Sequence, residues 1–188
     1  MHGPYRIEAF VIASADGMIA DAHGSMPPAL KNDADQRFFE QGLDRAAVVV
    51  HGRHSHEHQK NSAERRRLIL TRKVAALAPD PAHPHSLLWN PAGIAFGEAC
   101  RALEVDGGTA AIIGGTDVFT MFLATGYDAF HLSRASRLRL PGGRPVFTQV
   151  RFGRMPEDIL AEHRLQPGPM RVLDAAAAVT LVTWTAGA

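Results

Sequence analysis

Ala110-Ala111-Ile112-Ile113-Gly114-Gly115-Thr116-Asp117 is the stretch that decides the fold class of this 188-residue chain. Its four leading apolar residues form a short continuous run, which is typical of a strand buried on both faces of a parallel sheet. The run leads directly into two glycines, and residues 117–124 then predict a helix with Val118, Met121 and Phe122 on its apolar side. The stretch therefore indicates a strand–turn–helix unit of an α/β protein.

The same alternation of strands and helices continues on both sides of this unit. Residues 6–14 predict a first strand, which Asp16-Gly17 turns into an irregular loop over 18–28. After Pro141-Gly142-Gly143 the pattern changes to alternating residues, which predicts two antiparallel strands joined by a long hairpin. We therefore expect one α/β domain over 1–188, with a mostly parallel central sheet and antiparallel C-terminal strands. The remaining strands are predicted at 46–50, 67–71, 87–89, 129–133, 161–165 and 179–184, and the remaining helices near 33–43, 54–60 and 93–103.

Composition limits the classes of function. Hydrophobic residues make up 46% and charged residues 21% of the chain, which excludes disorder as the main state. The formal net charge of +1 lacks the basic excess of a protein that coats nucleic acid. One cysteine cannot form an internal disulfide, no apolar run approaches the roughly 18 residues of a membrane span, and the N-terminus does not resemble a signal peptide. We expect a cytoplasmic enzyme or binding module.

The near-neutral total conceals one strongly basic segment. Residues 51–73 carry seven Lys or Arg and two Asp or Glu, a net charge of +5, whereas residues 1–50 carry four and seven, a net charge of −3. Three predicted strand exits carry unusual residues, and two of them lie in this segment. They are His51-Gly52-Arg53-His54-Ser55, Thr71-Arg72-Lys73 and Gly114-Gly115-Thr116-Asp117.

These exits predict a phosphorylated cofactor. Ligands of parallel α/β sheets bind beyond the carboxyl ends of the strands. Glycines let the backbone N–H groups of a helix start approach a pyrophosphate, and arginine binds phosphate in a bidentate manner. Arg53, Thr71, Arg72 and Lys73 would supply donors for an extra phosphate, as in NADP. The G-x-G-x-x-G and Walker A patterns are both absent from the sequence.

At these residues the sequence resembles the dihydrofolate reductase superfamily, which includes the reductase domain of bacterial riboflavin-biosynthesis deaminase/reductases. Two of the matching stretches are more similar to the riboflavin type, namely Asp-Gly-Met-Ile-Ala and Gly-Gly-Arg-Pro-Val-Phe. Two others are more similar to dihydrofolate reductase, namely Met-Pro…Leu…Asp and Gly-Arg-His-Ser. The matching stretches follow family order over about residues 6–147: 15–20, 26–33, 52–55, 68–71, 113–116, 130–133 and 140–145.

The resemblance implies a three-layer dihydrofolate-reductase-like fold and NADPH-dependent hydride transfer to a pteridine or pyrimidine ring. By it, residues 16–27 would form a mobile loop over the nicotinamide, and Gly114-Gly115 a tight turn, with a cis peptide bond, beside the pyrophosphate. The residues that it places at the cofactor are Ala13, Ile19, Gly52, Arg53, His54, Ser55, Thr71, Arg72, Gly114, Gly115, Thr116, Asp117 and Val118.

The resemblance also implies a buried acid. Asp33 falls where dihydrofolate reductase keeps its carboxylate, and Ser133 where the family has a hydroxyl bonded to that acid. The interval from Asp33 to Gly52 is longer than in dihydrofolate reductase, which makes Asp35 a rival; Asn32 or Asp33 is alternatively a helix cap. The substrate-binding residues would be Met26, Phe38 and Arg65. Arg65 lies where dihydrofolate reductase has an arginine for the folate glutamate, and Arg66 and Arg67 are the alternatives.

Three functions follow. The first is reduction of dihydrofolate or a related dihydropterin. The second is reduction of 5-amino-6-(5-phosphoribosylamino)uracil in riboflavin biosynthesis, with the substrate phosphate bound by arginines. The third is a non-catalytic NADP-binding protein. It is favoured because Pro28 stands where the family has an aromatic residue, and Phe119 where the family has a tyrosine near the nicotinamide. The candidate phosphate-binding arginines are Arg37, Arg134, Arg137 and Arg139.

The expected partners are small molecules. We predict no metal site, because the histidines at 51, 54, 56 and 58 have no nearby cysteine and only Glu57 as a neighbouring acid. Neither a nucleic acid nor a membrane is expected as a partner. A homodimer formed through the antiparallel C-terminal strands is common in the riboflavin-type relatives.

Overall fold

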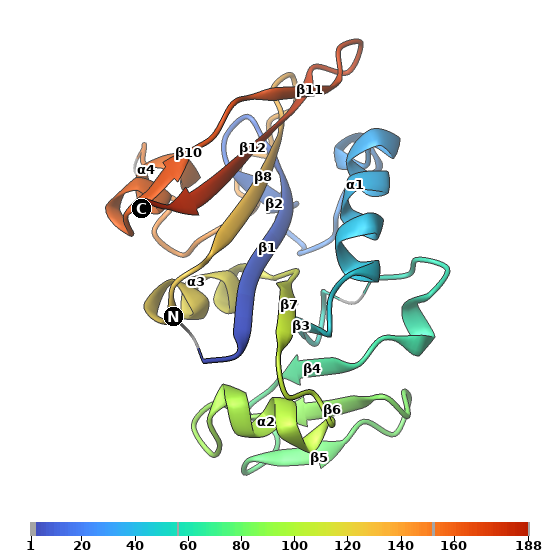
Figure 1. The fold of residues 1–188 in the computed structure, drawn as a ribbon. Coiled ribbons are helices and arrows are strands. Elements are labelled where there is room, and N and C mark those ends of the chain that lie inside the picture. The colour runs from blue at the N-terminus through green and yellow to red at the C-terminus, as the bar shows by residue number, and fades with distance from the viewer. Residues whose placement is uncertain (1–2, 56, 152, 188) are drawn as a thin grey trace.

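The computed structural model describes residues 3–55, 57–151 and 153–187. Six neighbouring strands at its centre run parallel, in the order β8-β1-β7-β3-β4-β6. Figure 1 shows this sheet twisting through the whole molecule. The six strands are β1 (Tyr5–Ser14), β3 (Val48–Gly52), β4 (Arg67–Leu70), β6 (Ser86–Trp89), β7 (Gly108–Ile112) and β8 (Ala129–Ala135).

Antiparallel strands complete the sheet at both ends. β5 (Leu77–Pro79) pairs with β6, and β12 (Val179–Ala186) pairs with β8. β10 (Leu165–Pro167) and β11 (Arg171–Asp174) both pair with β12. The predicted parallel centre with antiparallel C-terminal strands is therefore confirmed. β2 (Met18–Ala20), which lies in the stretch expected to be an irregular loop, pairs with β9 (Arg144–Pro145) in a separate two-stranded sheet.

Helices cover both faces of the sheet, as the side-chain alternation of the central strands requires. In β3, Val48 and Val50 pack with α2 (Phe96–Ala102) and α3 (Thr116–Thr125). Val49, between them, packs with α1 (Asp33–Asp44) on the opposite face. The three-layer arrangement is therefore confirmed, and α1 stands alone over its face in Figure 1. No helix within the described residues is long and apolar enough to cross a membrane.

Local capping fixes the start of α1. The side chain of Asn32 accepts hydrogen bonds from the backbone N–H groups of Ala34 and Asp35, at 3.0 and 3.1 Å. Asn32, one of the two caps expected, thus satisfies N–H groups that the helix itself leaves unpaired. Near the other end of α1, Gly42 lies directly against the ring of Phe10 in β1. These two contacts determine how the first turn of α1 faces the sheet.

Two predicted elements are wrong. The segment 161–165 is not a strand, because Pro156 in the first turn and a capping interaction between Asp158 and the Met155 N–H start a helix, α4 (Pro156–Glu162). β11 takes its place as the hairpin partner of β12. The described part of 54–60 is not helical, because Glu57 in that segment turns inward to two arginines.

A polar network is buried between α1 and the sheet. His131 of β8 lies 3.3 Å from the Glu8 carboxylate and 2.9 Å from the Thr183 hydroxyl, and its ring stacks on Phe10. The hydrogen bond with His131, together with a smaller effect of Arg6, lowers the pKa of Glu8 to about 2 against the opposing effect of burial. The ionised form of Glu8 therefore stabilises the fold.

Replacing Glu8 with glutamine tests this network. A lowered carboxyl pKa gives stability that is present above the unfolded value of 4.5 and is lost as pH falls through about 2. We expect E8Q to lower the free energy of unfolding at pH 7 by about 2 kcal/mol, a figure discounted for the exposed Arg6. Chemical denaturation between pH 7 and pH 2 should then show that E8Q loses less of its free energy of unfolding toward acidic pH than the wild type does. The matched control E104Q, at an 89% exposed side chain, should change neither quantity, and equal curves for E8Q and wild type would contradict the account.

Candidate functional site

Three of the predicted strand exits lie side by side. β7, β3 and β4 are consecutive parallel neighbours, with Val50 opposite Ile112 and Gly52 opposite Leu70. The backbone N–H of Gly52 donates to the carbonyl of Gly114 at 2.7 Å, which ties the β3 exit to the β7 exit. The glycines and the basic segment that follow these strands therefore share one carboxyl edge of the sheet, where parallel α/β folds bind ligands.

The glycine pair at the β7 exit forms a cradle with an open helix end. The Gly114–Gly115 peptide bond is cis, as the resemblance implied, and Gly114 has φ +102°, a conformation that favours glycine. A Cβ on Gly115 would lie 3.1 Å from the Ser55 hydroxyl, so the β3 exit segment closes over this turn. Gly115 is the N-cap of α3, and no side chain accepts a hydrogen bond there. The amino end of α3 is thus open to an anion.

Cationic side chains border the cradle. Arg53 and His54 follow Gly52 and are exposed, and so are Arg72 and Lys73 after β4. Thr71 is buried, and its hydroxyl accepts a hydrogen bond from the Lys73 N–H at 3.2 Å. Helix N–H groups, a glycine turn and exposed basic side chains form a donor set that fits a ligand with several phosphates, such as NADPH.

Other residues expected at the cofactor lie in the core or join α3 to neighbouring segments. Val118 of α3 packs beneath Gly52, with its Cγ2 3.5 Å from where a Cβ on that glycine would lie. Ala13 is fully buried in the main core, and Ile19 of β2 packs partly against it. Thr116 donates its hydroxyl hydrogen bond to the carbonyl of Pro145, which joins α3 to β9.

The two candidate acids differ sharply in environment. Asp33 is the first residue of α1 and is exposed. Asp35 lies within the same turn but faces the sheet, near Ser133 of β8. Burial raises the pKa of Asp35, and the Ser133 hydroxyl offsets part of that rise. A carboxyl group with a raised pKa is suited to general-acid work.

The hydroxyl of Ser133 is buried without a hydrogen-bond partner among the described residues. The residue is 1% exposed, and its Oγ makes no hydrogen bond to any described residue. It lies close enough to the Asp35 carboxyl to lower the pKa of that group. A buried hydroxyl that no described side chain satisfies is costly in a core, and such groups are concentrated at functional sites.

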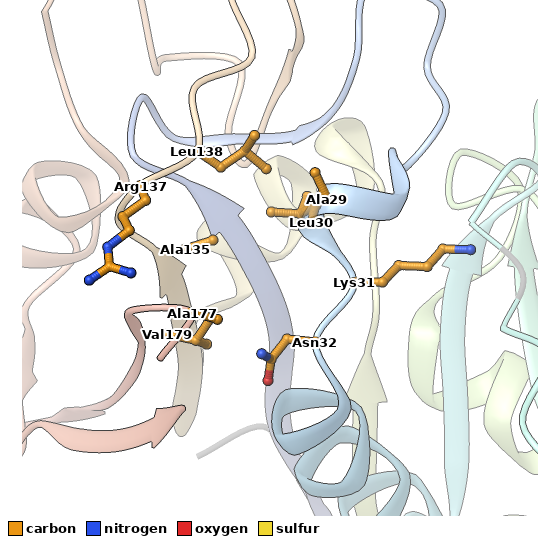
Figure 2. A pocket seen from close by; sticks show the side chains of 9 residues that line it. All are labelled: Ala29, Leu30, Lys31, Asn32, Ala135, Arg137, Leu138, Ala177 and Val179. Atoms are coloured by element: carbon orange, nitrogen blue, oxygen red, sulfur yellow. The ribbon is translucent and has the colours of Figure 1, made fainter. Parts of the chain in front are cut away.

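A small cavity lies between the start of α1 and the strands β8 and β12. Its volume is about 250 Å³, and Figure 2 shows apolar side chains converging on it. The charged ends of Lys31 and Arg137 point away from the middle of the cavity in the same view. Its lining is Ala29, Leu30, Lys31, Asn32, Ala135, Arg137, Leu138, Ala177 and Val179.

The residues expected to bind substrate are not brought together. Arg65 is bonded to Asp44 at 2.5 Å and to Glu57 at 2.8 Å. Phe38 is covered by Phe10, by His131 and by the Arg171 guanidinium, 5.8 Å from its ring centre. Met26 is 45% exposed in its loop.

The other arginines proposed for a substrate phosphate also scatter. Arg134 points to the Ala15 carbonyl and to Glu157, on the face of β8 opposite Ser133, while Arg37 and Arg139 are exposed. Within the described residues no three His, Cys, Asp or Glu side chains are grouped to hold a metal ion, and His56 lies outside those residues.

Together the sheet order, the two helical layers and the glycine cradle define a dihydrofolate-reductase-like fold. No protein-family model matches the chain, and no curated protein is detectably similar to it in sequence. Its fold is nevertheless similar to several solved structures. One is the diaminohydroxyphosphoribosylaminopyrimidine deaminase/5-amino-6-(5-phosphoribosylamino)uracil reductase of Thermotoga maritima, at 17% identity and a TM-score of 0.66, covering 98% of this chain and 57% of that one.

Two further structures match over nearly their whole length. A pyrimidine reductase-like protein of Corynebacterium diphtheriae is 16% identical with a TM-score of 0.65, covering 96% of this chain and 91% of that chain. Dihydrofolate reductase of Enterococcus faecalis, complexed with NADP(H) and RAB-propyl, is 16% identical with a TM-score of 0.59, covering 96% and 95%. At these identities the likeness establishes the fold alone.

Proposed function

We propose that this chain is an NADPH-dependent reductase that transfers a hydride to the carbon of a C=N bond, either in a pteridine ring or in the ring-opened form of a phosphoribosylaminopyrimidine. The observation that carries the proposal is a half-buried acid, Asp35 of α1, which lies beside Ser133 over a sheet whose carboxyl edge also carries a phosphate-binding cradle. The solved structures of similar fold include proteins named as reductases of pyrimidines and of dihydrofolate.

The cradle would hold the phosphates of the cofactor. The open amino end of α3 faces the pyrophosphate in this assignment, and the Gly114–Gly115 turn lets it approach the backbone. Arg53 and Arg72 then pair with the phosphate on the adenosine ribose. When bound, the dihydronicotinamide of NADPH supplies the hydride.

Asp35 would supply the proton. Because its pKa is raised, part of the population is protonated at a pH where an ordinary aspartate is fully ionised. Ser133 lies beside the carboxyl on β8, and its Oγ, which no described residue bonds, has capacity for a substrate atom or a water molecule. Delivery of the proton to the nitrogen of the same C=N bond, whose carbon receives the hydride, completes the reduction.

The substrate is either a dihydropterin, such as dihydrofolate, or 5-amino-6-(5-phosphoribosylamino)uracil. The pyrimidine is a specific second candidate because Arg65, the residue matched to the folate glutamate, is already bonded to two carboxylates. A buried, doubly paired guanidinium has little capacity for a third carboxylate. Loss of NADPH absorbance on adding each compound tests the proposal. Oxidation with one of them supports it, and NADPH binding without oxidation by either supports the non-catalytic alternative.

Cofactor choice gives a separate prediction. Because Arg72 follows β4 beside the cradle, R72A should raise the Kd for NADPH by ~10-fold and leave the Kd for NADH unchanged within about twofold. Isothermal titration with both dinucleotides measures this. R66A is the matched control, since Arg66 is an exposed arginine that precedes β4, at the opposite edge of the sheet. Equal losses for NADPH and NADH in R72A would remove Arg72 from the phosphate site.

A further inference from the structure

The segment that follows β3 contains a buried carboxylate among neighbours that are exposed or half-buried. Glu57 is 6% exposed, although the described residues on either side of it, from Arg53 to Lys60, are exposed or half-buried. The described residues of the segment lie in no helix or strand until residue 62. Because burying an unpaired carboxylate is costly, its inward position has to be stabilised by specific partners.

Those partners are two buried arginines. The guanidinium of Arg65 donates to Glu57 Oε1 at 2.8 Å, and that of Arg67 donates to the same oxygen. The backbone N–H of Gln59 donates to Oε2 at 2.8 Å. Arg67 also donates to the carbonyl and hydroxyl oxygens of Ser62, both at 2.8 Å, and the Ser62 hydroxyl donates to the carbonyl of Glu57.

The network anchors the segment to the rigid sheet. Arg67 is 1% exposed and is the first residue of β4, opposite Val49 of β3. Burial opposes ionisation of Glu57, but its hydrogen bonds prevail and its pKa is lowered, so the carboxylate stays charged. Apolar side chains of similar volume commonly give equal or greater stability than a buried ion cluster. The cluster is therefore better explained by the position it fixes than by the stability it adds.

The position it fixes is that of the cofactor cradle. Ser55 precedes Glu57 by two residues, and its hydroxyl lies against the Gly115 turn. Its N–H also bonds the carbonyl of Gly52 at 3.0 Å. We propose that Glu57, held by Arg65 and Arg67, is a positioning residue that sets the Arg53–Ser55 segment over the Gly114–Gly115 turn for the adenosine phosphates. This inference rests on the proposed function.

Direct binding tests the proposal without turnover. E57Q keeps the size of the side chain but removes its charge, so we expect the Kd values of NADPH and of 2′,5′-ADP to rise by ~10-fold or more. The fragment 2′,5′-ADP carries the phosphates without the nicotinamide and reports on the cradle alone. D44N is the matched control, because Asp44 is the other carboxylate on Arg65 but is 42% exposed and lies at the end of α1. It should change neither Kd by more than about twofold.

The outcomes separate this inference from the proposed function. Failure of the wild type to bind NADPH would overturn the function itself. Wild-type binding that E57Q leaves unchanged, despite a lowered Tm, would show that Glu57 only stabilises the fold and would overturn the positioning role. If E57Q does not fold, E57D serves instead: it keeps the charge but shortens the reach. It should weaken 2′,5′-ADP binding, and unchanged binding would again overturn the role.

Discussion

Replacing Asp35 with asparagine is expected to lower kcat at least ~100-fold, the usual contribution of a general acid, while the Kd for NADPH stays within about twofold of wild type. The reason is that Asp35 is the half-buried carboxyl of α1 beside Ser133 of β8, whereas the phosphate cradle follows β3, β4 and β7. In the wild type, kcat/KM should fall as pH rises through the raised pKa of Asp35, because the protonated form is the active one. Steady-state rates across pH measure both effects.

A stability measurement distinguishes a loss of catalysis in D35N from a loss of the folded state. Since the pKa of Asp35 is raised in the folded state, its contribution to stability is full below the ordinary aspartate value and is lost as pH rises through the raised one. D35N should therefore raise Tm at neutral pH while removing activity. D33N is the matched control, because Asp33 is exposed, and it should retain activity within about twofold. Loss of turnover in D33N, with D35N active, would reverse the assignment.

Replacing Gly42 with alanine should be the most damaging single methyl addition in α1. The new Cβ would lie 2.3 and 2.6 Å from two ring carbons of Phe10. That ring cannot withdraw easily, because it stacks on His131 at 4.6 Å and contacts Phe38 at 5.9 Å. Overpacking of this kind costs about 3 kcal/mol, and the higher helix propensity of alanine returns about 1, leaving a net loss of about 2 kcal/mol.

The matched control is another helical glycine with room around it. A Cβ on Gly97 in α2 would lie 3.7 Å from the Tyr5 ring, an ordinary contact, so G97A should leave stability unchanged or raise it by about 0.5 kcal/mol. Thermal unfolding of both variants provides the measurement, with a Tm decrease of roughly 6 °C expected for G42A. Equal Tm values for the two variants would contradict the packing of α1 on β1.

Strands buried on both faces were the most predictable part of the fold. The run at 110–113 and the apolar residues at 46–50 became β7 and β3, because burial on two faces leaves a continuous apolar signature. The cis turn at Gly114–Gly115 was predictable because the resemblance implied a tight turn with a cis peptide bond after that strand. The C-terminal part was less predictable: a capping interaction at Met155–Asp158 outweighed an alternating pattern that favoured a strand.

The acid and the ion network show where sequence reasoning stops. Asp33 and Asp35 are both acidic residues in the first turn of one helix, and only the rotation of α1 against β8 decides which one is buried. Glu57, Arg65 and Arg67 looked like part of an exposed basic segment, because their pairing depends on a segment that folds back to the start of β4. A carboxylate among closely spaced arginines was the one signal that could have indicated the network.

Isotope transfer tests the central claim most directly. The protein is incubated with NADPH deuterated at both C4 positions of the nicotinamide, together with dihydrofolate or, separately, 5-amino-6-(5-phosphoribosylamino)uracil. The product is then examined by mass spectrometry. We predict that one of the two substrates yields a product containing one deuterium atom, and that D35N yields almost none. A product without deuterium, or bound cofactor that neither substrate oxidises, would contradict the account.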